Sequence, residues 1–181
     1  MATLPELSVT DWAVLGALSS GASHGFAAAR LLAPGGEIGR VWTVSRPLVY
    51  RSLIHLAAEG LVSEEGTAPG AAGPRRRVVS PTRRGERALA AYLVSPVAHV
   101  RDYRSELMLK LLLLDGRPEE KRTLLRAQRT SLAPMCAGLA LRLEQAEGFE
   151  AVLARWRLDS ALAALRFLEG LGDREPRAPG R

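Results

Sequence analysis

The sequence predicts a mostly α-helical protein that carries a single β-hairpin. Aromatic residues make up only 5% of the 181 residues while Ala, Leu and Arg recur throughout, and this balance favours helices over sheets. Hydrophobic residues make up 47%, enough for the core of one large domain or two small ones. Apolar residues recur mostly at helical spacing, and β-like runs occur in one segment only.

Two short helices are predicted at the start of the chain. Ser8 and Asp11 have the spacing of a capping box, and apolar residues at three-residue steps extend the first helix over 9–20. Ser23 is expected to cap the second helix, over 24–33, which ends where a Pro-Gly-Gly run breaks the pattern.

The third predicted helix has one side that packs and one side that stays free. Ser45 caps it, and Pro47 lies in its first turn, where a proline costs no internal hydrogen bond. Tyr50 lies between the two sides on a helical wheel. The packing side consists of Val49, Leu53, Leu56 and Gly60. The free side consists of Pro47, Arg51, Ile54 and Ala58.

A hairpin and a basic segment follow the third helix. Two β-like runs, 61–64 and 75–80, are joined by a loop over 65–74 that is rich in turn formers. Residues 75–87 contain six arginines against Glu86 alone, a net charge of +5 in a chain whose net charge is +6. A ribbon with this charge gains free energy by releasing counterions from a polyanion such as DNA.

The rest of the chain is predicted to be helical. Thr82 caps a fourth helix that Pro96 bends or interrupts, and an apolar run leads on to an Asp-Gly stop. Two long helices follow, over 119–146 with a kink at Pro134, and over 149–171. Because a helix that is apolar on more than one side, as the apolar run indicates, must be buried both in its own domain and against a partner, a homodimer through this helical half is expected.

These elements predict an N-terminal winged helix-turn-helix with a two-stranded β wing, followed by a C-terminal helical dimerisation region. Three short helices and then a hairpin is the element order of that fold, in which the third helix enters the major groove of double-stranded DNA. We expect a DNA-binding domain over 1–95, a helical domain for dimerisation and effector response over 96–172, and a disordered tail over 173–181.

The candidate DNA-binding residues lie at the front of helix three and on the wing. Hydroxyl and guanidinium donors at the positive end of a helix dipole suit phosphates and base edges. A wing that lies along a groove suits phosphates. The predicted contacts are Ser45, Arg46, Tyr50 and Arg51 on the helix, and Arg75, Arg76 and Arg77 on the wing.

Four stretches of the sequence resemble PadR-type transcriptional regulators over residues 7–95. They are LSVTDWAVLGALSSGASHGF, YRSLIHLAAEGLV, the Gly-Pro-Arg-rich hairpin and the helix start SPTRRGERAL. The resemblance implies a homodimeric, ligand-responsive repressor that reads DNA with helix three and clamps it with the wing. The helical remainder is similar to that family in pattern only, and Val79 stands where the family commonly has an aromatic residue.

Several residues keep a second interpretation. The Arg75–Arg77 run is also compatible with a solvated turn flank, and Tyr50 with a ring that covers the edge of the core. Trp156 and Phe167 favour a core or dimer interface, and secondarily the wall of an effector pocket. For the whole protein the alternatives are a winged-helix protein-interaction module without DNA binding, and a ligand sensor whose DNA unit is vestigial.

Other function classes find no support in the sequence. Cys136 is the only cysteine, so an intrachain disulfide and a CxxC metal site are excluded. The histidines 24, 55 and 99 are scattered and no nucleophile elbow, P-loop or GxGxxG pattern occurs, so we expect no metal, no cofactor and no catalytic residue. No secretion signal or membrane span is recognised, which favours a soluble, cytoplasmic protein.

Overall fold

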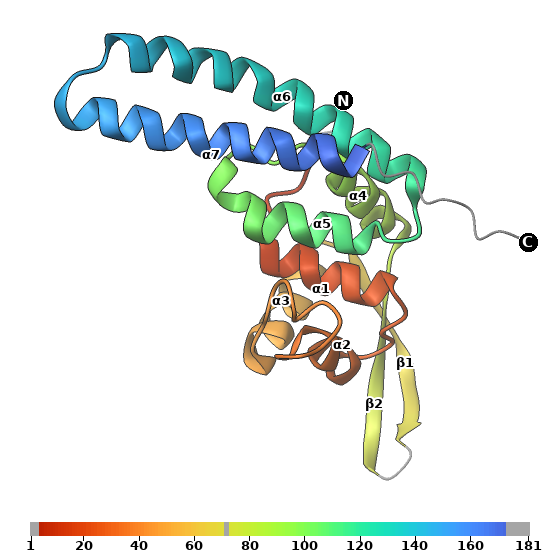
Figure 1. Ribbon diagram of the computed structural model, residues 1–181. Helices are drawn as coiled ribbons and strands as arrows, with labels where there is room; N and C mark the ends of the chain where they lie inside the picture. The colour runs from red at the N-terminus through yellow and green to blue at the C-terminus, as the bar shows by residue number, and fades with distance from the viewer. Residues whose placement is uncertain (1–3, 71–72, 173–181) are drawn as a thin grey trace, which may run out of the picture. The chain divides into compact units, whose positions relative to one another are not determined.

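The computed structural model describes residues 4–70 and 73–172, with the backbone alone described for 65–70 and 73–77 of the hairpin (Figure 1). The chain forms two compact units. Unit 1 comprises Met1–Leu93 and Arg104–Asp115, and unit 2 comprises Val94–Tyr103 and Gly116–Arg181. The described chain is mostly helical with one two-stranded antiparallel sheet, which confirms the predicted fold class.

The first helix of unit 1, α1 (Val9–Ser19), begins with the predicted capping box. The Ser8 hydroxyl accepts a hydrogen bond from the Asp11 N–H at 3.1 Å, and the Asp11 carboxylate accepts one from the Ser8 N–H at 3.0 Å. Every residue from Asp11 to Leu18 is buried, so α1 is the central helix of the unit. The N-terminal cap of α1 depends on residues close together in the sequence, whereas its burial depends on the elements that pack around it.

The second helix, α2 (Gly25–Leu32), is capped by His24, and the prediction that Ser23 caps it is wrong. The His24 backbone is extended and its Nδ1 accepts a hydrogen bond from the Ala27 N–H at 2.9 Å. An imidazole nitrogen in this position satisfies an N–H that the first helical turn leaves without an internal acceptor. The helix therefore starts one residue later than predicted.

The third helix, α3 (Arg46–Ala58), matches the predicted element in place and in orientation. Val49, Leu53 and Leu56 are buried, and Arg51 and Ile54 on the opposite side are exposed. Burial therefore follows the 3.6-residue periodicity of the sequence. The prediction that Gly60 belongs to the packing side is wrong, because α3 ends at Ala58 and Gly60 is exposed beyond it.

The hairpin consists of β1 (Val62–Gly70) and β2 (Gly73–Pro81), which pair antiparallel. The predicted loop over 65–74 is wrong, because the backbone ladder continues through most of it, for example from Thr67 to Arg77. The pairing is irregular after Glu64 and again after Ala68. Such irregularities let a ladder pass through turn-forming residues that propensity alone would place outside a strand.

The base of the hairpin is fixed to the helices of unit 1. Val79 is buried, and its backbone N–H donates to the Ser23 carbonyl at 2.9 Å. At the other side, the Thr82 N–H donates to the Leu61 carbonyl at 2.9 Å. The buried Val79 and these two hydrogen bonds thus attach the wing to the helices, although an aromatic residue was expected at this position.

The fourth helix, α4 (Arg83–Val94), is capped by Thr82 as predicted, since the Thr82 hydroxyl accepts from the Gly85 N–H at 3.1 Å. The Tyr92 ring stacks on the Trp12 ring of α1, with centroids 4.2 Å apart. The helix ends before Pro96, in line with the predicted interruption. A 3₁₀ turn (Val100–Asp102), a π-helical turn (Tyr103–Leu107) and α5 (Met108–Leu113) follow.

The segment Arg104–Asp115 belongs to unit 1, although the sequence places the domain boundary near residue 96. Lys110 of α5 is 1% exposed, lies 3.2 Å from the Glu106 carboxylate and stands 4.1 Å from the centroid of the Tyr92 ring. A Cβ on Gly16 of α1 would lie 2.5 Å from a Leu113 methyl group of α5, so a larger residue there would require the Leu113 side chain to move. Long-range contacts of this kind assign the segment to the first unit.

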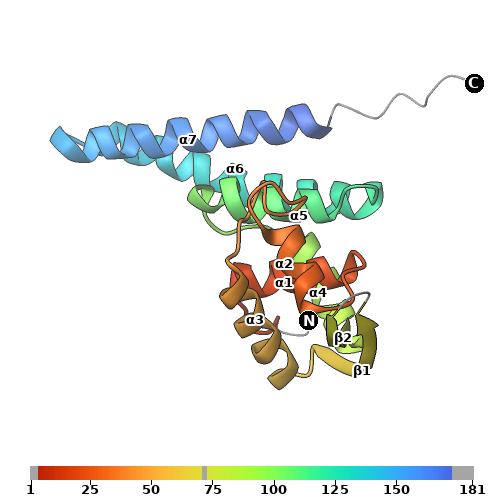
Figure 2. The ribbon, with the colours of Figure 1, turned by 90° about the horizontal axis from the view of Figure 1, so that it is seen from below.

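Unit 2 is built on an antiparallel pair of long helices, α6 (Pro118–Gln145) and α7 (Gly148–Gly172), which lie side by side in Figures 1 and 2. The helix α6 runs continuously through Pro134. On α7 the buried residues are small or aliphatic and recur every seven residues, namely Ala154, Ala161 and Leu168. The predicted tail over 173–181 lies outside the described residues.

In the described part of unit 2, a neutral polar side chain, that of Gln128, is buried. The Gln128 side chain accepts from the Val97 N–H at 2.7 Å and donates to the Val97 carbonyl at 2.9 Å and to the Tyr103 hydroxyl. Gln128 is 1% exposed. Its amide therefore satisfies backbone groups that no helix partner reaches, and it fastens the segment after α4 to α6.

Candidate nucleic-acid interface

The outward face of α3 is formed by arginines and apolar side chains. Arg46 and Arg51 are exposed, and Leu48, Tyr50 and Ile54 are 42%, 40% and 73% exposed. The helix contains no Asp or Glu from its first to its last residue. This face therefore combines positive charge with apolar surface, and nothing on the helix repels a polyanion.

The front of α3 is organised around Arg46. Its guanidinium carbon lies 5.1 Å from the centroid of the Phe26 ring on α2 and 5.9 Å from that of Tyr50. These distances are within the range of cation–π attraction. Ser45 occupies the N-cap position, but its side chain makes no capping hydrogen bond. The predicted residues Ser45, Arg46 and Tyr50 thus lie together at one end of the helix. Phe26 belongs to the same group, and the sequence did not predict it.

Close packing of α2 against α3 depends on a glycine. A Cβ on Gly25 would lie 2.9 Å from Tyr50 Cε1 and 2.9 Å from Leu53 Cδ1. Real Cβ atoms do not approach other heavy atoms this closely, so a larger residue would require the Tyr50 and Leu53 side chains to move. The Tyr50 ring is therefore packed along one edge while the rest of it stays exposed. Both interpretations of Tyr50 from the sequence, cover of the core edge and surface contact, fit this position.

A buried carboxylate fixes α3 to α1. Asp11 is 6% exposed, and besides its capping box it contacts His55 Nδ1 at 3.3 Å and hydrogen-bonds the Ser52 side chain. Burial alone would raise the pKa of Asp11, but the hydrogen bonds from Ser52, Ser8 and His55 outweigh it and hold the pKa below its usual value. The same carboxylate thus starts α1 and anchors the middle of α3, a role that the sequence analysis did not assign.

The wing lies on the same side of unit 1 as α3. Figure 1 shows the hairpin and α3 both below α1, and Figure 2, seen from below, shows both toward the viewer. The backbones of Arg75, Arg76 and Arg77 lie in β2, and their side chains are outside the described part of the structure. The backbone therefore brings the predicted wing segment to the same side of the unit as the predicted reading helix.

The arginines at the start of α4 have different surroundings. Arg84 is exposed, and its guanidinium donates to the Glu59 carbonyl at the end of α3. Arg87 donates through Nε to the Arg83 carbonyl at 3.2 Å. Beside these residues lies a cavity of about 320 Å³, lined by Leu4, Pro5, Leu61, Arg84, Arg87, Ala88 and Ala91. Part of the basic segment thus ties α4 to α3 and keeps its charge on the surface.

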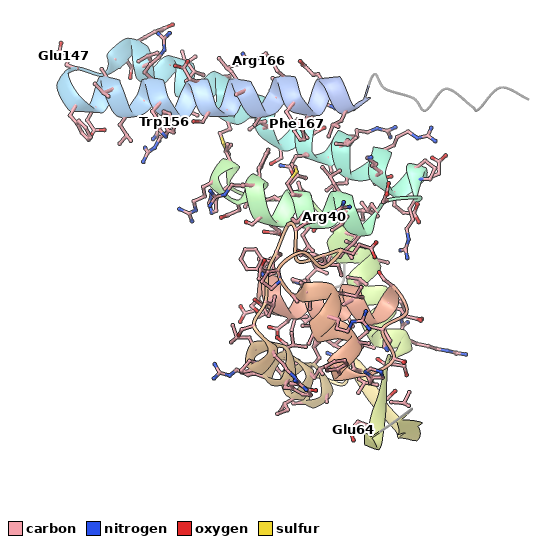
Figure 3. The ribbon with its side chains drawn as sticks, turned by 60° about the horizontal axis from the view of Figure 1, so that its bottom comes forward. Arg40, Glu64, Glu147, Trp156, Arg166 and Phe167 are labelled. Atoms are coloured by element: carbon pink, nitrogen blue, oxygen red, sulfur yellow. The ribbon has the colours of Figure 1, made fainter. Side chains whose placement is uncertain are left out.

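Trp156, the residue predicted to contact an effector, is 71% exposed on α7. A cavity of about 220 Å³ near the α6–α7 turn is lined by Leu139, Arg142, Gln145, Ala146, Glu150, Ala154 and Arg157, and Trp156 is not among these residues. Figure 3 shows Trp156 and Phe167 on one side of α7 and Arg166 on a different side. Trp156 therefore belongs to an exposed helix face, and it is not part of the core of its own chain.

Within residues 4–70 and 73–172, no three His, Cys, Asp or Glu side chains come together in a way that could hold a metal ion. His24, which stands beside a serine, uses its Nδ1 for helix capping. Burial raises the pKa of the Cys136 thiol above its usual value. None of the described helices is long and apolar enough to cross a membrane.

No protein-family model matches the sequence, and no curated protein does. Among solved structures, Bacillus subtilis PadR in complex with operator DNA has 20% sequence identity and a TM-score of 0.47, over 91% of this chain and 97% of that chain. The protein smu.1604c from Streptococcus mutans UA159 has 17% identity and a TM-score of 0.43, over 91% and 98%. Bacillus subtilis PadR in complex with p-coumaric acid has 20% identity and a TM-score of 0.40, over 90% and 93%.

Proposed function

We propose that this chain is a PadR-like transcriptional regulator that binds double-stranded DNA through α3 and the wing. The observation that carries the proposal is the outward face of α3, where Arg46 and Arg51 stand among exposed apolar side chains with no acidic residue on the helix. The helix is held from behind by the buried Asp11. A rigid, cationic helix face of this kind suits the major groove.

The two basic elements have different roles in this proposal. Arg51, near the middle of the exposed face, reads base edges, and Ser45, Arg46 and Tyr50 position the front of the helix on phosphates. Arg75, Arg76 and Arg77 clamp the backbone through charge, which contributes equally to every sequence. Reading and clamping are therefore separable by experiment.

The test compares Arg51→Ala with Arg76→Ala in DNA binding over a range of salt concentrations. Arg51→Ala is expected to weaken specific binding by about 1–3 kcal/mol and leave nonspecific binding nearly unchanged. Arg76→Ala is expected to weaken both, and to reduce the slope of log K against log salt by about 0.9 for the lost phosphate contact. Equal effects of the two variants on specific and nonspecific DNA would refute the division of roles.

The active species in this proposal is a homodimer formed through unit 2. Phe149, Val152 and Trp156 are 75%, 62% and 71% exposed on α7, on the side away from the buried Ala154 and Ala161. A contiguous apolar face of this kind marks a protein interface. A second copy of the chain is a suitable partner because a twofold interface needs one self-complementary surface.

Sedimentation velocity of Trp156→Glu tests the dimer. The substitution places a charge on the apolar face and is expected to shift the chain from dimer to monomer at micromolar concentration. The matched control is Arg166→Ala, which changes an exposed residue on a different side of the same helix and should leave the dimer intact. A Trp156→Glu variant that sediments like the parent would exclude this face as the interface.

The finer parts of the proposal follow from the dimer. Paired reading helices face a palindromic operator with half-site centres about 10–10.5 bp apart, and occupancy of the operator represses transcription in the cytoplasm. A small-molecule effector modulates binding, and Trp156 remains its candidate contact. The chain acts as a regulator and not as an enzyme.

The second candidate is a winged-helix module that binds a protein through α3. The apolar side chains of α3 favour it, since exposed apolar surface also suits a protein partner. Retention of mixed genomic DNA fragments on a filter separates the two candidates. A DNA-binding protein retains fragments at low salt and loses them as salt rises, whereas a protein-interaction module retains none above background.

A further inference from the structure

The exposed apolar side chains of unit 1 are concentrated on one motif. In the described part of the unit, the large apolar residues that are exposed are Phe26, Leu48, Tyr50 and Ile54, all on α2 and α3. Phe26 and Tyr50 are accounted for by the cation–π contacts with Arg46. Leu48 and Ile54 have no such explanation, and Ile54 at 73% is the most exposed of the four.

Ile54 stands beside the arginine that is proposed to read bases. It follows Arg51 by three residues, so the two side chains are neighbours on one face of α3, about 4.5 Å apart along the helix axis. Successive bases of one DNA strand are separated by about 3.4 Å. A base edge that Ile54 meets is therefore one or two base pairs from the base that Arg51 meets.

We propose that Ile54 is a specificity-determining residue that contacts the 5-methyl group of a thymine in the major groove. This inference rests on the proposed DNA binding by α3. The thymine methyl is the one apolar group that a base pair presents in that groove. A branched aliphatic side chain makes no hydrogen bonds but can pack against this methyl group. In the proposed DNA complex Arg46 holds the front of the helix on phosphates and Arg51 reads a base edge. Ile54, on the same face as Arg51, then also meets a base edge.

The test removes the methyl group from the DNA and the side chain from the protein. The DNA is the site that the parent protein selects from a random pool, and each thymine in it is replaced in turn by deoxyuridine, which lacks only the methyl. At one position this replacement is expected to weaken binding of the parent about fourfold, the effect of one apolar carbon returned to water.

Ile54→Ala is expected to bind the thymine site about four- to tenfold more weakly than the parent, and to show no further loss with deoxyuridine at that position. Ala is a strong helix former and the site is exposed, so the fold is retained. The matched control is Leu48→Ala, an equally apolar truncation on the same helix, which should keep the fourfold response at the Ile54 position.

Two results would overturn the inference. If the effects of Ile54→Ala and deoxyuridine multiply at every thymine, or if Ile54→Ala binds like the parent, Ile54 does not read a methyl group while DNA binding by α3 stands. If the parent protein retains no DNA at all, the proposed function fails together with this inference.

Discussion

The two units of the chain bury different kinds of polar group. The buried polar residues of unit 1 include Asp11 and Lys110, at 6% and 1% exposure, and both are ionisable. In the described part of unit 2 the buried polar residue is Gln128, a neutral amide. Asp11 titrates in acid, whereas the ionisable groups buried in the described part of unit 2, Tyr103 and Cys136, have raised pKa values and stay protonated there. The stability of unit 1 should therefore depend on pH in acid, while that of unit 2 should not.

Their exposed surfaces differ as well. On α3 the apolar side chains stand among arginines without any acid, whereas on α7 Arg155 is paired with Asp159 at 3.0 Å. A one-sided positive charge suits a polyanion, and a balanced helix suits another protein surface. The comparison thus supports the proposed DNA surface on α3 and the proposed dimer surface on α7.

The largest expected effect on stability comes from the buried ion pair of unit 1. Glu106→Gln removes the partner of the buried Lys110 and is expected to destabilise unit 1 by about 3 kcal/mol. Burial lowers the pKa of Lys110 while Glu106 opposes this shift, so without Glu106 the pKa falls further. Urea unfolding followed by the fluorescence of Trp12 and Trp42, in a Trp156→Phe background, measures the change.

The double variant Glu106→Gln with Lys110→Met serves as its control. It replaces the pair by groups that bury no charge, and it should recover most of the stability lost in the single variant. A single variant as stable as the parent would show that the pair is not needed to hold α5 in unit 1.

A smaller, pH-independent loss is expected in unit 2. Gln128→Leu leaves the N–H and carbonyl of Val97 without their buried partner, which costs about 2 kcal/mol. Unfolding followed by Trp156 fluorescence, between about pH 4 and pH 8, should show the same loss throughout. A loss that varies with pH would contradict the neutral character of this core.

The smallest effect is expected from the anchor of α3. Asp11→Asn keeps the shape of the side chain but removes its charge, and it should destabilise unit 1 by about 1–2 kcal/mol at neutral pH. Because the folded pKa of Asp11 lies below its unfolded value, its contribution is fully present above the unfolded pKa and disappears as pH falls through the folded pKa.

Urea unfolding of the parent and of Asp11→Asn at a series of acidic pH values checks this sign. The two proteins should converge in stability as the pH falls. Ser8→Ala, which removes the two hydrogen bonds of the Ser8 hydroxyl with Asp11 but no charge, is the control. A difference between parent and Asp11→Asn that grows in acid would contradict the assigned pKa direction.

The sequence predicted the helices well because their signals are local. The Ser8–Asp11 capping box and the two sides of α3 follow from spacing along the chain. The extent of the hairpin could not be predicted in this way. The pairing of Thr67 with Arg77 is a contact between two strands, and the β propensity of single residues does not indicate such a contact. That residues 104–115 belong to unit 1 could not be predicted either, because it reflects contacts between distant parts of the sequence, such as that of Leu113 with Gly16.

The candidate interface also contains residues that the sequence could predict and residues that it could not. Arg46, Tyr50 and Arg51 could be predicted because charge and periodicity place them on a free helix face. The Phe26 ring beside Arg46 and the Asp11 anchor behind α3 could not, since each joins two helices. A sequence pattern indicates which side of a helix is free, and the tertiary structure is needed to show what holds that side in place.

Selection of bound sites from a random pool of double-stranded DNA tests the central claim most directly. A dimer that reads DNA with α3 should enrich an inverted repeat whose half-site centres lie about 10–10.5 bp apart, and Arg51→Ala should fail to enrich it. If the parent protein enriches no sequence and retains no DNA even at low salt, α3 does not read DNA.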